Sequence, residues 1–168
     1  MTGERTDAPE LSKPLSETEI RRLVGEIAVS SPAAESAWQA LRPLGPAVAP
    51  YLLEAYADAK RWQGRTSLVF HAIRFARVSE AAYALGLKAL ADKSYMVRYR
   101  ACMVVAYSLR ADAIPALQPL LQHADARTRE DAARALDAIH HQNHHFFVDH
   151  RHSGRSYWVV NETDRPLS

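Results

Sequence analysis

Residues 87–101 read LKALADKSYMVRYRA, and a related arrangement occurs before and after this segment. In each copy an apolar helical run ends near an aspartate, and an arginine and an alanine-containing helix follow. The aspartates are Asp58, Asp92 and Asp125, which are 34 and 33 residues apart. Periods of about 20 to 50 residues are typical of helical repeat proteins, because one helix pair cannot bury its apolar face without stacked neighbours. The sequence therefore predicts an all-α fold, a short right-handed α-solenoid of helical hairpins.

The central and last copies share a more specific pattern. The residues concerned are Asp92, Val97, Arg98 and Ala101, followed by Asp125, Arg129 and Ala132. They resemble HEAT-like repeats, in which the first helix often has a proline near its start, the turn carries an aspartate, and the second helix opens with Val-Arg. The resemblance covers about residues 32–142, although residues 60–64 replace the usual short turn in the first copy. It implies an α-solenoid, but HEAT-like arrays serve as scaffolds, inhibitors and, in a few bacterial cases, DNA glycosylases.

The composition fits one compact domain. The chain has 168 residues, of which 48% are apolar, enough for a sizeable core. It has a charged N-terminus and no run of about 18 apolar residues, so we expect neither a membrane span nor a signal peptide. The single cysteine, Cys102, lies among apolar helix residues, which predicts a core residue in a reducing compartment. We therefore expect a cytoplasmic protein.

Caps and apolar spacing predict where the helices lie. Ser16 and Glu19 form a capping box that opens a first helix, and Ser31-Pro32 predicts the start of a second helix that ends before Pro43. We expect further helices at about residues 46–57, 63–77, 80–91, 95–109, 113–122 and 127–142. The predicted organisation is a disordered tail (1–14), a HEAT-like repeat domain (15–142), a β-hairpin (143–162) and a flexible tail (163–168).

After residue 143 the sequence pattern changes from helical to extended. Residues 146–148 read FFV and residues 157–160 read YWVV, and the polar stretch 150–155 separates them. Such short aromatic and β-branched runs around a turn predict a small C-terminal β-hairpin. Two isolated strands are marginal in water, so the hairpin should either cap the last repeat or contact a partner.

Six of the eight histidines lie between residues 140 and 152. If the last helix continued, two i, i+4 histidine pairs would lie on its surface, a spacing suited to a metal ion. The pairs are His140 with His144 and His141 with His145. The sequence has no HExxH carboxylate, and histidine is also favoured near a helix C-terminus because its cation complements the helix dipole. We therefore predict no metal and no cofactor, with these four histidines as the weaker alternative.

Charge is distributed unevenly along the chain. Residues 60–110 contain ten basic and two acidic residues, a net charge of +8. Residues 1–59 have five against nine, or −4, and residues 111–168 have six against eight, or −2. We call residues 60–110 the basic band, and it would attract an anionic partner. A structural alternative stays open, because Arg98 and Arg129 could instead pair with turn aspartates between repeats.

Two classes of function follow from the basic band. The first is a non-catalytic protein-interaction module, such as an adaptor, a scaffold or a toxin-neutralising immunity-type protein, which binds the acidic surface of a partner protein. Its predicted contact residues are Trp62, Arg65, Arg74, Arg98, Tyr99 and Arg100, since aromatic and arginine side chains dominate interface energetics. The alternative is a nucleic-acid-binding protein related to HEAT-like DNA glycosylases, in which Asp58 or Asp112 would be the candidate carboxylate.

The residues favour the first class. The sequence has no Ser-His-Asp set, no paired acids in an apolar setting, no phosphate loop and no CxxC metal motif. A protein that follows a phosphate backbone gathers about six to ten basic contacts on one face, whereas these basic residues are spread over three predicted helices and their turns. We therefore expect no enzymatic activity.

Overall fold

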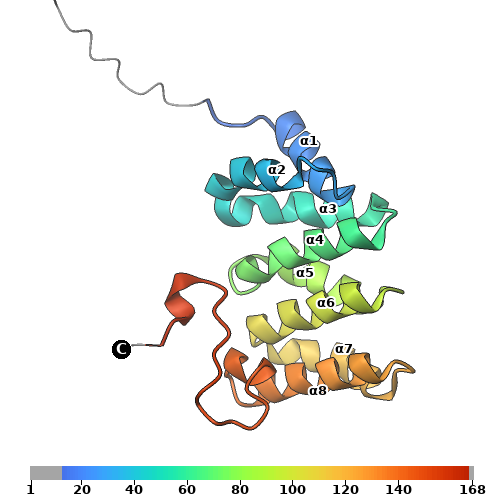
Figure 1. Cartoon of the computed structure of the whole chain (residues 1–168), viewed down its shortest axis with the longest axis vertical. Helices are drawn as coiled ribbons and strands as arrows, with labels where there is room; N and C mark the ends of the chain where they lie inside the picture. The colour runs from blue at the N-terminus through green and yellow to red at the C-terminus, as the bar shows by residue number, and fades with distance from the viewer. Residues whose placement is uncertain (1–12, 167–168) are drawn as a thin grey trace, which may run out of the picture.

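The computed structural model describes residues 13–166, and within this range it contains helices but no strand (Figure 1). The α-helices are α1 (Glu17–Ala28), α2 (Ala34–Leu41), α3 (Ala49–Asp58), α4 (Trp62–Ala72), α5 (Glu80–Ala89), α6 (Tyr95–Ser108), α7 (Ile114–Leu117) and α8 (Ala126–His140). The 3₁₀ helices are η1 (Arg42–Val48), η2 (Ile73–Phe75), η3 (Ala111–Ala113), η4 (Gln118–Gln122), η5 (His144–Phe147) and η6 (Glu162–Asp164). The predicted all-α class is confirmed. The predicted tail 1–14 lies almost wholly outside the described residues, as do residues 167–168 of the second tail.

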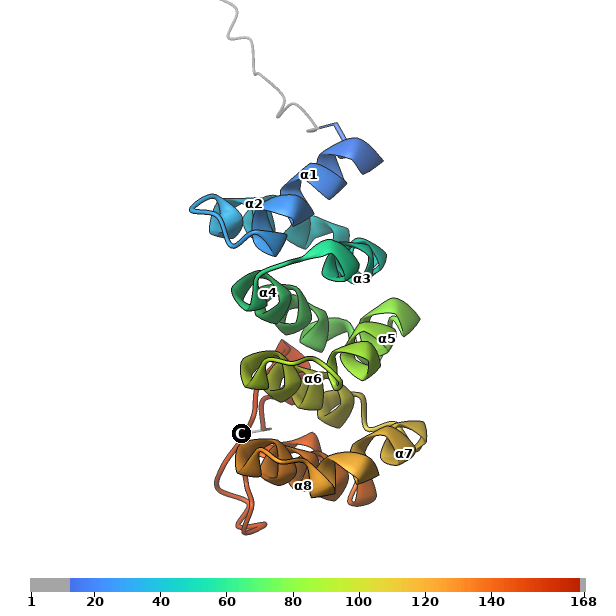
Figure 2. The same cartoon turned by 90° about the vertical axis from the view of Figure 1, so that its right-hand side faces the viewer.

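The helices stack in successive pairs along the long axis of the molecule (Figure 2). Helices α2, α4, α6 and α8 form one layer, which we call the even-helix layer, and α3, α5 and α7 form the other. Two glycines allow close helix approach. A Cβ on Gly64 would lie 1.7 Å from the carbonyl oxygen of Ala28, and a Cβ on Gly86 would lie 2.4 Å from Val104 Cγ1. Stacking of this kind buries apolar faces that a single helix pair leaves exposed.

Caps and prolines explain the helix boundaries. The capping box of Ser16 and Glu19 is confirmed at the start of α1. The predicted start at Ser31-Pro32 is wrong by two residues, since the Ser31 hydroxyl bonds Glu26 and the Ala33 N–H in a turn that precedes α2. The predicted helix at 113–122 is divided into α7 and η4, because Pro119 has no N–H to continue the α-helical pattern.

Arginines of the even-helix layer link successive repeats. Arg65 donates to carbonyl oxygens of its preceding turn and pairs with Asp92 of the next repeat, with 2.7 Å between Nε and Oδ2. Arg98 likewise donates to the Asp92 carbonyl oxygen and pairs with Asp125 at 3.5 Å. We call these two ion pairs the arginine ladder. Arg129 donates to the carbonyl oxygens of its own turn and has no aspartate partner among residues 13–166. The pairing of these arginines with a turn aspartate of another repeat is therefore found for Arg98 and not for Arg129.

The predicted C-terminal β-hairpin is wrong. Phe146 and Phe147 lie in the 3₁₀ helix η5, so the run at 157–160 has no partner strand. Side chains bond its backbone instead. The Trp158 N–H donates to His145 Nδ1 at 3.0 Å, and the Trp158 carbonyl oxygen lies 2.9 Å from His144 Nε2. The imidazoles of His144 and His145 thus make the hydrogen bonds to the backbone that a second strand would have made. The alternation of apolar residues in the sequence does not indicate such side-chain hydrogen bonds.

Residues 141–166, which we call the C-terminal segment, run from the end of α8 back along the edge of the even-helix layer (Figure 1). The side chain of Asn161 donates to the carbonyl oxygen of Arg74 at 3.1 Å. The hydroxyl of Tyr107 in α6 donates to the buried carboxylate of Asp164 at 2.9 Å, and the N–H groups of Val160 and Asn161 bond the same carboxylate. The segment therefore stays attached to the helices as far as Asp164.

Candidate functional site

A continuous row of aromatic rings, with one arginine in its middle, crosses the even-helix layer. We call it the aromatic strip, and its members, in spatial order, are Trp38, His71, Phe70, Arg100, Tyr99, Phe147 and Trp158. It begins on α2, passes over α4 and α6, and ends on η5 and the C-terminal segment. Each neighbouring pair is in contact, so the strip joins α2, α4 and α6 to the C-terminal segment in one surface.

The first part of the strip is a stack between α2 and α4. The rings of Trp38 and His71 are 3.9 Å apart and nearly parallel, and Phe70 meets His71 edge-on at 5.3 Å. Burial, with a smaller contribution from Arg74, lowers the pKa of His71 to about 4, so this ring is neutral at pH 7. The guanidinium of Arg74 lies 5.8 Å from the Trp38 ring. Burial and the neighbouring Arg42 lower the pKa of Arg74.

Arg100 occupies the centre of the strip. Its guanidinium lies 4.8 Å from the centre of the Phe70 ring and 5.4 Å from that of Tyr99. One Nη atom contacts the sulfur of Met103 at 3.5 Å, and the buried Nε has no hydrogen-bond partner among the described residues. Aromatic faces attract this cation, yet an arginine ordinarily also donates to oxygen acceptors. Its hydrogen-bonding capacity is therefore left largely unused.

The last part of the strip attaches the C-terminal segment to the repeats. Tyr99 stacks at 6.2 Å on Phe147, and Phe147 lies 5.4 Å from Trp158. Trp158 also meets Tyr107 edge-on at 5.7 Å. Phe147 and Tyr107 are buried, whereas Phe70 is 45% exposed. Phe70 and Arg100 are therefore where the strip opens to solvent.

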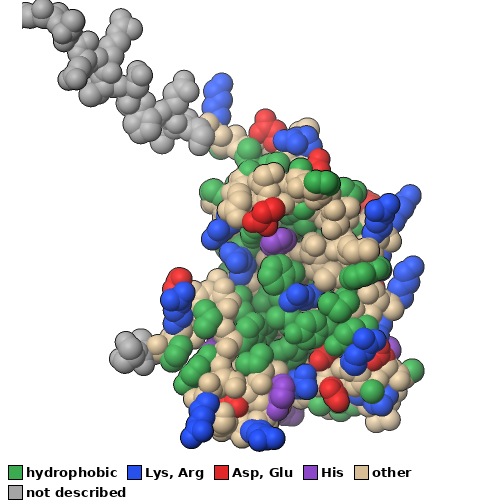
Figure 3. All heavy atoms as spheres, in the orientation of Figure 1, with side chains coloured by type: hydrophobic (Ala, Val, Ile, Leu, Met, Phe, Trp, Pro, Cys, Tyr) green, Lys and Arg blue, Asp and Glu red, His purple; other side chains and the backbone are tan. Residues whose placement is uncertain are grey.

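Basic side chains accompany this opening. Arg42, Arg74 and Arg100 form no ion pair with any residue between 13 and 166. Figure 3 shows the same face with an apolar area over α4 and α6, Lys and Arg side chains in and around it, and no acidic side chain within it. The charge of Glu35, at the α2 end, acts on His71. The exposed centre of the strip is thus apolar and positively charged.

Comparison with known families identifies part of this architecture. A family model described as HEAT repeats matches residues 83–144. This range includes α6, α8 and the ion pair of Arg98 with Asp125. Residues 83–144 therefore contain HEAT-like repeats. HEAT repeats generally mediate protein interaction or scaffolding and are typically non-catalytic. The chain shows no significant match to a curated protein or to a solved structure. Between residues 13 and 166, no helix is long and apolar enough to cross a membrane.

The structure places the six predicted contact residues in different surroundings. Arg74, Tyr99 and Arg100 lie on or beside the aromatic strip. Trp62 is 44% exposed at the start of α4. The other two, Arg65 and Arg98, are buried in the arginine ladder. Their guanidinium groups hold neighbouring repeats together, so these two arginines are not part of the exposed surface.

Sequence reasoning missed most of the strip. Tyr99 and Arg100 are predicted contact residues, whereas the other five members are not: Trp38, His71, Phe70, Phe147 and Trp158. Phe70 at the end of α4 and Arg74 in the following η2 are four residues apart, a local signal that they share one helix face. The approach of Phe147 to Tyr99 has no such signal, because the two residues are 48 positions apart in the sequence and meet only in the fold.

The histidines do not form the two predicted pairs, because α8 ends at His140. His144 is buried between Arg77 and Trp158. The Arg77 side chain can only donate to His144 Nδ1, at 2.9 Å, and the Trp158 carbonyl oxygen can only accept from His144 Nε2. His144 is therefore neutral, with its proton on Nε2, and burial lowers its pKa, as do the neighbouring His145 and Arg77. His141 instead approaches Asp137, with 3.1 Å between Nδ1 and Oδ1.

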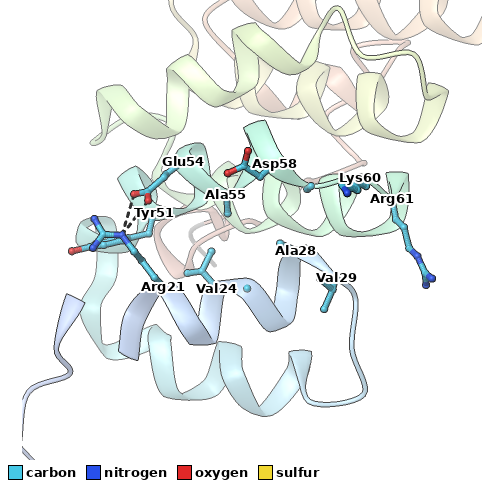
Figure 4. Close-up of a pocket in the computed structure, with 12 residues that line it drawn as sticks. Arg21, Val24, Ala28, Val29, Tyr51, Glu54, Ala55, Asp58, Lys60 and Arg61 are labelled. Carbon is cyan, nitrogen blue, oxygen red and sulfur yellow. Dashed lines mark hydrogen bonds and ion pairs between the residues drawn. The ribbon is translucent and has the colours of Figure 1, made fainter. Parts of the chain in front are cut away.

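A cavity of about 680 Å³ lies between α1 and α3, at the first junction of the helix stack (Figure 4). The ion pair of Arg21 and Glu54, 3.1 Å apart, borders one end, and Asp58 lies toward the other. Helix α2 has no arginine that could pair with Asp58 in the manner of the ladder. The first periodic aspartate therefore lines a cavity, and the first junction relies on the stack of His71 on Trp38 and on the contact of Gly64 with Ala28.

The carboxylates considered for catalysis lie away from the aromatic strip or are already paired. Asp112 forms an ion pair with Arg110 at 2.7 Å and accepts a hydrogen bond from the Tyr83 hydroxyl at 2.9 Å. Asp58 lines the cavity between α1 and α3. A third acid, Asp131, is buried with one oxygen unbonded among the described residues, and burial raises its pKa. None of the three forms an ion pair or a hydrogen bond with Arg100 at the open centre of the strip.

Proposed function

We propose that this protein is a non-catalytic protein-interaction module that binds an acidic segment of a partner protein across the exposed centre of the aromatic strip. The observation that supports this most directly is the state of Arg100. Its guanidinium is half-buried between Phe70 and Tyr99 and pairs with no carboxylate among the described residues. A carboxylate from a partner would give this cation the charged acceptor that its own chain does not provide.

The energetics of arginine favour such an occupant. A hydrogen bond from a charged group to a carboxylate is roughly twice as strong as a neutral one, and the guanidinium of Arg100 donates only to the Met103 sulfur among the described residues. A carboxylate can accept two parallel hydrogen bonds from a guanidinium, which fixes its orientation as well as its position. The aromatic rings on either side exclude water from the pair and strengthen it.

The surroundings define the rest of the expected ligand. Phe70 offers an exposed apolar contact, and Arg74 and Arg42 offer two further cations toward the α2 end. A peptide that alternates acidic and apolar side chains would match this order of groups. An adaptor, a scaffold or an immunity-type protein that neutralises a toxin would each use the face in this way.

The test is selection of a displayed library of random short peptides on the immobilised protein. We expect enrichment of Asp and Glu interspersed with apolar residues, and a Kd at least about tenfold weaker for Arg100→Gln and for Phe70→Ala. Lys93→Gln is the matched control, since it removes one exposed positive charge from the turn before α6. Arg65 is unsuitable for this test because its loss would break the arginine ladder.

Two results would contradict the proposal. One is the absence of acidic enrichment among the selected peptides, and the other is binding that neither Arg100→Gln nor Phe70→Ala weakens. Labelled single- and double-stranded DNA and RNA are measured beside the peptides at two salt concentrations. Saturable binding that falls steeply with salt and depends on Arg100 would favour the nucleic-acid alternative, in which bases stack on aromatic rings.

A further inference from the structure

We propose that Asp137, His141 and His152 form a binding site for a divalent transition-metal ion, with Zn²⁺ as the reference ion. The three side chains offer one carboxylate oxygen and two imidazole nitrogens, which all lie within 4.8 Å of one another. This site is separate from the aromatic strip and does not depend on the proposed function. It also differs from the histidine pairs that the sequence indicates, since it retains only His141 of those four residues.

The donor distances are close to those that a bound metal requires. His152 Nε2 lies 2.6 Å from Asp137 Oδ2, and His141 Nδ1 lies 3.1 Å from Asp137 Oδ1. Zinc binds nitrogen and carboxylate oxygen at about 2.0–2.2 Å, which separates tetrahedral donor atoms by about 3.3 Å. Small rotations of three side chains would therefore create the coordination geometry, without movement of the backbone.

Two of the donors are fixed by helix α8. Asp137 and His141 are four residues apart, at the last turn of α8 and its C-cap, so they face the same side. His141 also meets the ring of Phe146 edge-on at 5.4 Å. The helix and this aromatic contact hold the two side chains in one orientation before any ion arrives.

The third donor is held in place by an ordered loop. The buried carboxylate of Asp149 accepts hydrogen bonds from the N–H groups of Ser153 and Gly154, at 3.0 and 2.8 Å. This turn places His152 in the left-handed region, with φ of 51°. The His152 ring then stacks on Phe146 at 3.8 Å, with only 10° between the planes. A site whose donors are oriented by their surroundings loses less conformational freedom on binding.

The donor set defines the class of ion. Two imidazoles and one carboxylate suit Zn²⁺, Co²⁺ or Ni²⁺, whereas Ca²⁺ and Mg²⁺ prefer oxygen ligands only. His141 and His152 are exposed, so the remaining coordination position is open to water or to a ligand from another molecule. A bound ion would join the loop at 149–154 to α8 and stabilise this end of the C-terminal segment.

The test uses the full chain after treatment with a chelator. Titration calorimetry with ZnCl₂ should show saturable binding of one ion, and Co²⁺ should give the visible absorption of a low-symmetry nitrogen and oxygen site. Zinc should also raise the Tm. His152→Ala, His141→Ala and Asp137→Asn should each weaken zinc binding at least about tenfold. His140→Ala is the matched control, because His140 is exposed one residue from the site and is not one of its donors.

The variants also separate a metal site from a simple polar contact between His152 and Asp137. His152→Gln keeps a hydrogen-bond donor for Asp137 while it removes the imidazole ligand, so metal-free stability should be nearly retained and zinc affinity lost. Absence of saturable binding to the wild-type protein would overturn the proposal. So would zinc affinity that is unchanged in His152→Ala, or that His140→Ala reduces equally.

Discussion

The junctions of the arginine ladder and the attachment of the C-terminal segment perform the same task by different means. In the ladder, Arg65 and Arg98 each reach from an even helix to an aspartate of the next repeat, and the same contact recurs after one period. The C-terminal segment is held by a network that occurs once, in which Tyr107, His144 and Asp164 bond one another or the intervening backbone. A repeated contact leaves a repeated pattern in the sequence, whereas a contact that occurs once does not.

The first junction of the array is a third case. It has a periodic aspartate, Asp58, but no ladder arginine, and a cavity lies between α1 and α3. Its contacts include the stack of His71 on Trp38 and the exposed ion pair of Arg21 with Glu54. The three kinds of junction should therefore respond differently to mutation and to acid.

The largest effect is expected for the ladder. Arg98→Ala removes the donor of the Thr128 hydroxyl and of the Asp92 carbonyl oxygen, and it removes the cation 3.5 Å from Asp125, which keeps its hydrogen bonds from Arg127. Loss of these buried hydrogen bonds should cost about 2–3 kcal/mol of unfolding free energy. Arg129→Ala, at the same position of the next repeat, should cost less than about 1 kcal/mol because Arg129 is exposed. Urea unfolding of both variants gives the comparison, and equal losses would show that the ladder contributes no more than local turn contacts.

Acid should weaken the first junction before it affects the ladder. The pKa of His71 is lowered from 6.5 to about 4, so the unfolded chain binds a proton in this range that the folded chain does not. Stability should therefore be complete above about pH 6.5 and should decrease as the pH falls from 6.5 to about 4. Hydrogen bonds from Arg127 lower the pKa of Asp125 to about 2, so the carboxylate that pairs with Arg98 stays ionised in this range.

His71→Phe is the matched variant for this acid dependence. It retains a ring for stacking on Trp38 and removes the titrating group, so Tm should change less between pH 7 and 4.5 than in the wild-type protein. A wild-type slope that persists in His71→Phe would assign the acid dependence to another group.

A smaller and local effect is expected at the C-terminal attachment. Tyr107→Phe removes the hydroxyl that donates to Asp164 and accepts from the Asn161 side chain. The buried carboxylate would lose one donor, at a cost of about 1–2 kcal/mol. Hydrogen exchange should become faster in residues 157–164 while the ladder turns remain protected. Tyr157→Phe serves as the control, since the Tyr157 hydroxyl bonds only the nearby Gly154 carbonyl oxygen. Uniformly faster exchange in Tyr107→Phe would contradict a local attachment.

The smallest expected effect is the release of the same segment at mildly acidic pH. Burial, His145 and Arg77 lower the pKa of His144, which accepts from Arg77 only while it is neutral. The attachment should therefore be complete above the ordinary histidine pKa, and it should weaken as the pH falls through and below it. Proteolysis after residue 150, measured from pH 7 to 5, should accelerate in the wild-type protein. His144→Gln should remove most of this pH dependence, and a variant that retains it would exclude His144 as the cause.

The repeat architecture could be predicted because its causes are local and recur. The apolar spacing of the helices and the aspartates at a 33- to 34-residue period indicated the all-α class, and the position of Arg98 indicated one rung of the ladder. The contact surface was predicted less well. Arg65 and Arg98 are of a residue type that is common in contact surfaces, and only their burial shows that they hold repeats together.

The sequence by itself determined the helical class, the repeat period and the basic band, because each depends on residue types at regular spacings. Only the tertiary structure decided which arginines are exposed, how the C-terminal segment attaches and which histidines share a carboxylate. These features depend on residues that are distant in the chain, such as Arg77 with His144 and Tyr107 with Asp164, which are 67 and 57 positions apart. The two residues of such a pair meet because the intervening helices stack on one another. Which residues pair is therefore decided by the packing of the helices and not by any local sequence pattern.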